Sequence, residues 1–235
     1  MTDKHAAAPD ETAPRRKFYG RRQGRPLRDS RKRLIEDLLP RLAIRLDGSA
    51  IDPASLFQDR QEIWLEIGFG GGEHMAAQAA AHPGIGYIGC EIFINGIASG
   101  LAHIDAQKLD NVRLYAEDAR DLLAALKPRS LDRLFLLFPD PWPKSRHAPR
   151  RFINQENLDR VAALLKPGAE FRVGSDDPTY VAWTMMHMSR RKDFIWRAER
   201  ASDWLVRPAD WPASRYEQKA IAQGRTPHYF IYSRL

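Results

Sequence analysis

Within seven residues the chain presents a carboxylate, an aromatic ring and an ammonium group, in the sequence F-P-D-P-W-P-K at 138–144. Three prolines restrict the backbone between these groups, so Asp140, Trp142 and Lys144 are expected on a rigid tip. An apolar run precedes the tip, and open α/β sheets bind ligands at the carboxyl ends of their strands. We therefore predict an active site around Asp140. The alternative is a proline-rich turn around a core tryptophan. It accounts less well for three prolines that alternate with Asp140 and Trp142.

Three arginines follow directly, in the sequence S-R-H-A-P-R-R at 145–151. The planar guanidinium group suits two-point binding of phosphate. Arg146, Arg150 and Arg151 are therefore candidates for contact with a nucleic-acid backbone. A solvated basic loop is the alternative for this segment taken alone.

A glycine-rich turn occupies 66–73, with the sequence E-I-G-F-G-G-G-E. Gly68 and Gly70 would let the backbone approach a bound nucleotide closely. A dinucleotide fingerprint would require Gly or Ala at position 73, where this chain has Glu73. That carboxylate would compete with a pyrophosphate for the positive end of the following helix. The turn therefore favours a cofactor without phosphates.

Acidic residues stand at the ends of three successive expected strands: Glu66, Glu91 and Asp118. From such positions Glu91 could accept hydrogen bonds from ribose hydroxyls, and Asp118 would lie near adenine. S-adenosylmethionine carries ribose, adenine, an amine and a sulfonium, and acidic residues match its donors and its positive charge. Solvated strand ends remain the alternative, but the pattern favours S-adenosylmethionine.

The elements that must position these residues alternate between strand and helix. The almost wholly apolar segment 131–138 has the composition of a parallel strand covered on both faces and is expected at the centre of the sheet. A helix capped by Ser30 is expected over 31–39. The other expected strands are 63–67, 87–92, 112–116, 170–173, 194–196 and 228–232, with helices at 73–81, through 97–104 and 122–126, and at 155–165 and 178–191. This order predicts an α/β fold with a doubly wound, mostly parallel, seven-stranded Rossmann-like sheet.

The net charge of +7 is concentrated at the N-terminus, because residues 1–33 contain 11 basic and 4 acidic residues while the rest is balanced. Residues 1–28 are poor in large apolar side chains and are expected to form a disordered basic arm. Residues 29–235 are expected to form one catalytic domain. A basic arm can bind RNA phosphates through counterion release; a leader that only aids solubility is the alternative.

Several classes of protein are excluded by what the sequence lacks. The single cysteine, Cys90, permits no intrachain disulfide or C-x-x-C site and is expected to be a small buried side chain rather than a nucleophile. No metal site is predicted. The absence of a signal peptide or a long apolar segment predicts a cytoplasmic protein that does not cross a membrane. P-loop, zincin, EF-hand and serine hydrolase motifs are also absent.

The order of motifs resembles that of the bacterial tRNA (guanine-N7-)-methyltransferases, from about residue 30 to the C-terminus. The resemblance rests on the following segments: 66–72, G-C-E at 89–91, E-D-A at 117–119, F-P-D-P-W-P-K at 138–144 with S-R-H-A-P-R-R-F after it, S-D-D at 175–177 and S-R-Y-E at 214–217. It implies a class I S-adenosylmethionine-dependent methyltransferase fold, with Glu66, Glu91, Asp118 and Asp140 along the cofactor pocket. It also implies that Asp140 is catalytic. The residues that it assigns to the substrate are Lys144, Asp176, Ser214, Arg215, Tyr216 and Glu217, and those that it assigns to RNA are Arg146, His147, Arg150 and Arg151.

The function that the resemblance implies is methylation of N7 of guanine 46 in the variable loop of tRNA. Guanine N7 carries no hydrogen, so Asp140 is expected to hold the base rather than to remove a proton. Trp142 or Tyr216 could stack on the base. The alternatives are a methyltransferase of the same fold that acts on another RNA, a small molecule or a protein, a noncatalytic RNA-binding module and, last, a nicotinamide oxidoreductase. The sequence leaves open whether the protein is a monomer or a homodimer.

Overall fold

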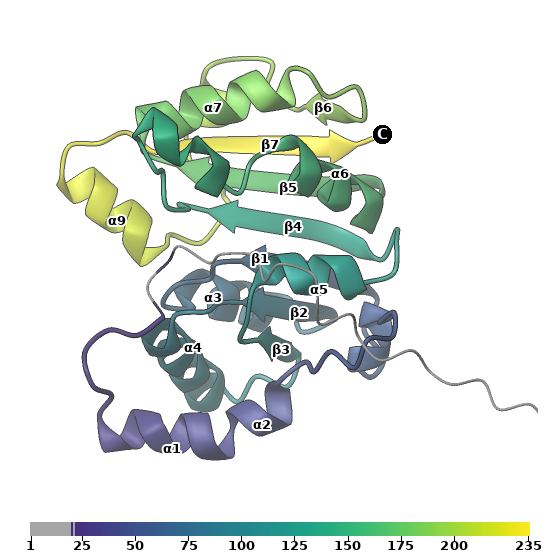
Figure 1. Cartoon of the computed structure of the whole chain (residues 1–235), viewed down its shortest axis with the longest axis vertical. Coiled ribbons are helices and arrows are strands. Elements are labelled where there is room, and N and C mark those ends of the chain that lie inside the picture. Colours follow the sequence, from purple (N-terminus) through teal and green to yellow (C-terminus); the bar gives the residue numbers. More distant parts are fainter. Residues whose placement is uncertain (1–19, 21) are drawn as a thin grey trace, which may run out of the picture.

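Seven strands form one sheet in the order β3-β2-β1-β4-β5-β7-β6, in a computed structural model that describes residues 20 and 22–235 (Figure 1). β7 pairs antiparallel with β5 and β6, and the other neighbours pair parallel. The bounds are β1 Glu62–Ile67, β2 Ile85–Cys90, β3 Val112–Tyr115, β4 Leu131–Leu137, β5 Leu165–Ser175, β6 Phe194–Trp196 and β7 His228–Arg234. The expected doubly wound, mostly parallel sheet with its fourth strand at the centre is confirmed.

Helices pack on both faces of this sheet. The side chains of α3 and α4 belong to one apolar cluster, and those of α5, α6 and α7 belong to the other. The helices are α1 Asp29–Asp37, α2 Leu39–Leu42, α3 Glu73–Ala81, α4 Ile94–Gln107, α5 Ala119–Ala125, α6 Gln155–Leu164, α7 Pro178–Met188, α8 Ser202–Leu205 and α9 Arg215–Ala222, with 3-10 helices η1 Pro53–Leu56 and η2 Ser145–Arg150.

The central strand β4 shows why the sheet is covered on both sides. Leu134 and Leu136 pack in the cluster of α5 to α7, whereas Phe135 and Leu137 pack in the cluster of α3 and α4. Successive side chains of a strand point to opposite faces, so an uninterrupted apolar run fills both layers. After Leu134 the strand has no polar residue, and the next one along the chain is Asp140, on the loop that follows β4.

Two local predictions were wrong. The first helix begins at Asp29, and its N-cap residue is Arg28, without a side-chain cap. Ser30 lies inside the helix, since Asp29 supplies a carboxylate to the first turn, where it pairs with Lys32 at 2.9 Å. The segment Lys166–Gly168 was expected to separate a helix from a strand, but it lies inside β5, next to a register shift between Leu131 and Arg133 of β4.

Part of the expected N-terminal arm lies against α4. The backbone N–H of Ile94 donates to the carbonyl of Arg22 at 3.0 Å, and the Asn95 side chain bonds to Gly24 and Arg25. Residues 1–19 and 21, which hold the rest of the expected arm, lie outside the described residues.

Candidate active site

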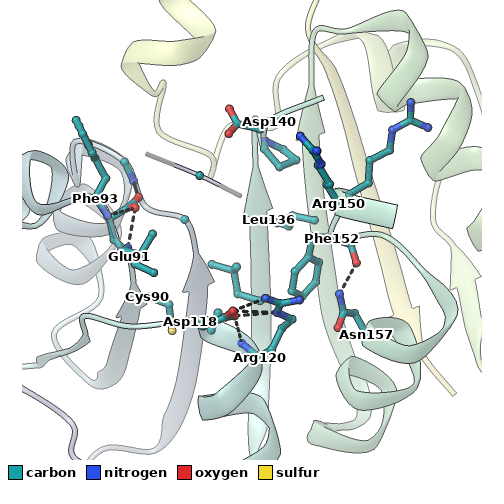
Figure 2. A pocket seen from close by; sticks show the side chains of 18 of the residues that line it. Cys90, Glu91, Phe93, Asp118, Arg120, Leu136, Asp140, Arg150, Phe152 and Asn157 are labelled. Carbon is teal, nitrogen blue, oxygen red and sulfur yellow. Dashed lines mark hydrogen bonds and ion pairs between the residues drawn. The ribbon is translucent and has the colours of Figure 1, made fainter. Parts of the chain in front are cut away.

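A cavity of about 430 Å³ opens at the carboxyl ends of the central strands (Figure 2). This volume is in the range of small-molecule and cofactor sites. The residues that were expected at a site and that line the cavity are Gly68, Gly70, Glu91, Asp118, Asp140, Arg150, Arg151 and Tyr216. Ile67, Leu136 and Phe138 add an apolar wall. The structure thus brings the acidic residues of three separate segments to one hollow.

The glycine turn forms one wall of the cavity, as expected. Gly68 has φ +70° and Gly70 has φ +58°, both in the left-handed region that favours glycine. A Cβ atom on Gly70 would lie 2.6 Å from the Tyr216 ring. A Cβ atom on Gly68 would meet nothing within 4 Å, so Gly68 borders open space. The backbone at Gly68 can therefore be approached by a ligand.

Glu91 connects this turn to the start of α4. Its Oε2 accepts from the Gly70 N–H at 2.8 Å, and its Oε1 accepts from the N–H groups of Ile92 and Phe93 at 2.8 and 2.9 Å. Burial raises the pKa of Glu91 despite these backbone hydrogen bonds, and the charge of Asp140 raises it further. A carboxylate has about four acceptor sites, of which three are taken here. One site, on Oε2, is left for a donor from a ligand.

Asp118 lies at the lower edge of the cavity in Figure 2 and caps α5 by accepting from the backbone N–H of Arg120 at 3.0 Å. Both carboxylate oxygens also accept from the Arg120 guanidinium, which raises the pKa of Arg120. Arg120 also lines the cavity. Sequence reasoning missed it, although a basic residue two positions after a capping aspartate is a usable signal.

Asp140 is exposed on the loop that follows β4, and Figure 2 shows it at the same end of the cavity as Arg150. The buried side chain of Arg151 stabilises this loop. Arg151 donates to the carbonyl oxygens of Pro141 and Trp142 at 3.0 and 2.9 Å, and its guanidinium stacks 4.4 Å from the Trp183 ring.

Arg151 was expected to touch RNA, but it is only 4% exposed. Its hydrogen bonds serve the loop carbonyls, which need buried donors. Arg150 instead stacks on Trp142 at 4.9 Å, and Trp142 lies edge-on to His147. Desolvation and the charges of Arg150, Arg146 and Lys144 lower the pKa of His147.

Glu66 was expected along the cofactor pocket, but it does not line the cavity. It is 2% exposed, and its Oε2 accepts from Tyr87 Oη at 2.8 Å and faces His74 Nδ1 at 2.9 Å. The reason is the alternation along β1: Ile67 faces the cavity, and Glu66 points to the other face of the sheet. Through these contacts with Tyr87 and His74, Glu66 connects β1 to β2 and to α3.

In the segment 214–217, two residues are buried and two are exposed. Ser214 Oγ accepts from the Glu217 N–H at 3.1 Å and caps α9. Glu217 is 2% exposed, accepts from Tyr229 Oη at 2.6 Å and pairs with Arg207 at 3.0 Å. Both were expected to contact substrate, but the structure uses them to fix α9. Arg215 and Tyr216 are exposed beside them, and Tyr216 borders the cavity.

Lys144 and Asp176 lie outside the cavity lining. Asp176 pairs with Arg225 at 2.5 Å, and Lys144 precedes η2 with its side chain exposed. Arg146 is also exposed on η2. The exposed positions of Lys144 and Arg146 suit contact with a large substrate around the cavity, whereas the Asp176 side chain is mostly buried against Arg225.

Cys90 is buried, as expected, and burial raises the pKa of its thiol. Among the described residues, no group of three or more His, Cys, Asp or Glu could hold a metal ion. Within the same part of the chain, no helix has the length and apolar character needed to span a bilayer.

Comparison with known proteins gives consistent results. A family model described as "Putative methyltransferase" matches residues 60–230. A tRNA (guanine-N(7)-)-methyltransferase of Rhodospirillum rubrum is 50% identical, covering 96% of this chain and 91% of the relative. One of Paramagnetospirillum magneticum is 52% identical, covering 98% of both chains.

Solved structures share the fold at low identity. An rRNA methylase of Streptococcus thermophilus has a TM-score of 0.51 at 12% identity, covering 78% of this chain and 92% of the other. A 16S rRNA (adenine(1408)-N(1))-methyltransferase of Catenulisporales acidiphilia, solved with its cosubstrate, has a TM-score of 0.51 at 16% identity, covering 75% and 86%.

Proposed function

Because the chain belongs to the family of tRNA (guanine-N(7)-)-methyltransferases, we propose that it methylates N7 of guanine 46 in the variable loop of tRNA. The fold is that of the class I methyltransferases, and the methyl donor is S-adenosyl-L-methionine. The observation that carries the proposal is the cavity at the ends of the strands. Glu91 and Asp140 line it, and so does Gly68, whose backbone borders open space.

The residues of the cavity fit the methyl donor, which supplies a methyl group bound to a positively charged sulfur. Gly68 offers an open backbone, and Glu91 keeps one acceptor site for a hydroxyl donor. The carboxylates that line the cavity, Glu91, Asp118 and Asp140, favour a cationic ligand over a phosphate-bearing one. Ile67 and Leu136 supply the apolar surface that a purine ring requires.

Asp140 holds the target base. Guanine N7 has an in-plane lone pair and no hydrogen, so no general base is needed. Methylation leaves a positive charge on the purine, and a nearby carboxylate stabilises that charge. By accepting hydrogen bonds from the Watson–Crick edge, Asp140 would also align N7 with the methyl group.

Tyr216 and Trp142 are the candidates for stacking on the guanine. Both border the cavity, and Tyr216 is 44% exposed. A paired or stacked guanine must leave its neighbours before N7 can reach the methyl group, at a cost of a few kcal/mol. An exposed aromatic ring at the mouth of the cavity offsets part of that cost.

The cations near the cavity would bind the tRNA backbone. They are the exposed Lys144 and Arg146 with the half-buried His147 and Arg150 on one side, and the exposed Arg215 beside Tyr216. Phosphate contacts of this kind position the substrate without reading its sequence. A tRNA substrate also supports a cytoplasmic location.

The test is to incubate the protein with unmodified tRNA and methyl-labelled S-adenosylmethionine, and to identify the labelled nucleoside by mass spectrometry after digestion. We expect 7-methylguanosine, and no label in a transcript with adenine in place of guanine 46. Label in 7-methylguanosine from both transcripts would contradict the position. Label in another nucleoside would support the alternative of a methyltransferase of this fold that acts elsewhere on RNA.

A further inference from the structure

The end of the cavity opposite Asp140 is polar. Figure 2 shows Asp118, Arg120 and Asn157 at this lower end and Asp140 at the upper end, and all four residues line the cavity. Asp118 and Arg120 belong to the start of α5, and Asn157 lies in the first turn of α6. Two separate segments of the chain therefore supply hydrogen-bonding groups to the same end of the cavity.

Asn157 presents an oxygen without a partner. The residue is 4% exposed, and its Nδ2 donates to the Phe152 carbonyl at 2.8 Å. A carbonyl oxygen only accepts hydrogen bonds, so this contact fixes which end of the Asn157 amide is nitrogen. Among the described residues, no donor binds Asn157 Oδ1. A buried acceptor that lines a cavity and has no such partner is suited to a donor on a ligand.

Arg120 presents donors at the same end. Its Nε and Nη2 atoms donate to the Asp118 carboxylate, which also accepts from the Arg120 backbone N–H at 3.0 Å. These contacts hold the guanidinium in a fixed plane. Within residues 22–235, Nη1 of Arg120 has no hydrogen-bond partner, and no hydrogen bond joins Arg120 to Asn157. One donor group and one acceptor therefore remain for a ligand.

The chemistry of the methyl donor directs its adenine ring to this end. Glu91 has an acceptor site for a ribose hydroxyl, and the ribose carries adenine on one side and the sulfonium chain on the other. The methyl group must lie toward Asp140, which holds the target base. Adenine then extends from the ribose toward the polar end. Leu136 lies between the two ends in Figure 2 and supplies apolar surface for the ring.

We infer that Asn157 and Arg120 determine the specificity for the adenine base of the methyl donor. The Watson–Crick edge of adenine has a donor, the N6 amine, next to an acceptor, N1. Asn157 Oδ1 accepts from N6, and the Arg120 guanidinium donates to N1. Asp118 is a positioning residue, because it acts on the ring through Arg120. The inference rests on the proposed function for the identity of the methyl donor, and not for the base that is methylated.

The test compares two ligands that differ only at this edge, S-adenosyl-L-homocysteine and S-inosyl-L-homocysteine. In the inosyl ligand an oxygen replaces the N6 amine and N1 carries a hydrogen. Acceptor then faces acceptor at Asn157, and donor faces donor at Arg120. Calorimetry on the full wild-type chain should show that the inosyl ligand binds at least about 10-fold more weakly, because each mismatch leaves a polar group unpaired. A smaller ratio of the two Kd values would overturn the inference.

Two variants locate the discrimination. Asn157→Leu removes the acceptor, and Arg120→Met removes the donors. Each should raise the Kd for S-adenosyl-L-homocysteine about 10-fold and change the Kd for the inosyl ligand less than about threefold, so the ratio falls. Gln155→Leu makes the same change from amide to leucine at an exposed position of α6 and should leave both Kd values unchanged.

Thermal unfolding shows whether each variant is folded. Arg120 is partly exposed, so Arg120→Met keeps the test open if the buried change Asn157→Leu prevents folding. An unchanged ratio of the two Kd values in either folded variant would contradict the assignment of that residue to the adenine edge.

A double-variant cycle separates positioning by Asp118 from direct contact with adenine. Asp118→Asn keeps a capping side chain for α5 but weakens the contact with the guanidinium. We expect the combination of Asp118→Asn and Arg120→Met to bind S-adenosyl-L-homocysteine no more weakly than Arg120→Met alone. Multiplicative losses in the combination would show that Asp118 contacts the ligand directly and would overturn its positioning role.

These binding measurements do not depend on methyl transfer. If the wild type does not bind S-adenosyl-L-homocysteine, the proposed function and the inference both fail. If the ligands are discriminated as expected but tRNA gives no 7-methylguanosine, the proposed function fails and the inference stands. If 7-methylguanosine forms but the two ligands bind alike, the inference fails alone.

Discussion

Arg151 Nη2 donates a hydrogen bond of 2.9 Å to the carbonyl oxygen of Trp142. Trp142 has φ +45°, a left-handed conformation that is uncommon for a bulky residue, and Phe138 at the start of the same loop has φ +49°. A buried guanidinium therefore stabilises a strained loop between β4 and η2. The same loop carries Asp140, so the geometry of the site depends on a side chain that is itself buried.

Replacement of Arg151 by lysine should lower kcat about 10- to 100-fold, because one ammonium group cannot hold both carbonyls in the fixed geometry of a guanidinium. Steady-state kinetics and thermal unfolding check this. Arg190→Lys, at an exposed turn position just after α7, is the control and should keep wild-type kcat. An Arg151→Lys enzyme of normal kcat would show that the loop is rigid without the guanidinium.

Tyr216→Ala should weaken tRNA binding by about 1–3 kcal/mol, the contribution of one base stacked on an aromatic ring. The affinity for S-adenosylmethionine should change much less, since Tyr216 lies at the exposed edge of the cavity. Trp142→Ala tests the other candidate ring in the same way. Two separate binding titrations measure this difference, and equal losses for both ligands would argue against stacking.

Asp140→Asn should lower kcat by about 100-fold, since the variant keeps the shape of the side chain but loses the charge that stabilises the cationic purine. The remaining activity should show no rise with pH of the kind that a required base produces on losing its proton. Single-turnover rates between pH 6 and 9 measure this for both enzymes. A wild-type rate that rises with pH and a variant rate that does not would identify Asp140 as a base.

Glu91 makes the stability of the ligand-free protein depend on pH. Burial raises its pKa in the folded protein above the ordinary value of 4.5, so over the interval between them the folded state binds more protons than the unfolded state. The contribution of Glu91 to the unfolding free energy is therefore complete below 4.5 and is lost as pH rises through the folded pKa. In Glu91→Gln this decline should be absent.

Urea unfolding at several pH values from 4 to 7 compares the two proteins. Asp105→Asn, an exposed change on α4, should follow the wild type. The same Glu91→Gln protein should bind S-adenosylmethionine roughly 10- to 100-fold more weakly, because a hydrogen bond to a charged acceptor contributes about 1.5–3 kcal/mol. Identical pH curves for wild type and Glu91→Gln would refute the assignment.

Tyr87→Phe should lower the unfolding free energy by about 1–3 kcal/mol, because it removes a buried hydroxyl that donates to Glu66. The Kd for S-adenosylmethionine should change little, since Glu66 does not line the cavity. Tyr232→Phe, on β7, removes the hydroxyl of a tyrosine that does not hydrogen-bond to Glu66, and it is the control that should leave the unfolding free energy nearly unchanged. A large loss of cofactor affinity with unchanged stability in Tyr87→Phe would indicate that Glu66 contacts the cofactor.

Local patterns in the sequence were sufficient for the sheet and for the location of the site. β4 could be placed at the centre because its second half, 134–137, is continuously apolar, which is typical of a strand covered on both faces. The glycine turn and the loop at Asp140 could be assigned because both are continuous segments whose residue types restrict the backbone. Glu91 was identified at a strand end, where side chains of parallel strands converge.

The role of an individual side chain depended on partners far along the chain. Glu66 was expected at the cofactor, but Tyr87 and His74 bind it on the opposite face of β1. Glu217 was expected at the substrate, but it is buried against Tyr229 on β7. A motif determines which chemical groups are present and in what order, whereas burial and hydrogen-bond partners are determined when separate segments pack together. For this reason the sequence alone located the cavity of this protein, and only the tertiary structure distinguished the residues that face it from those that hold it in place.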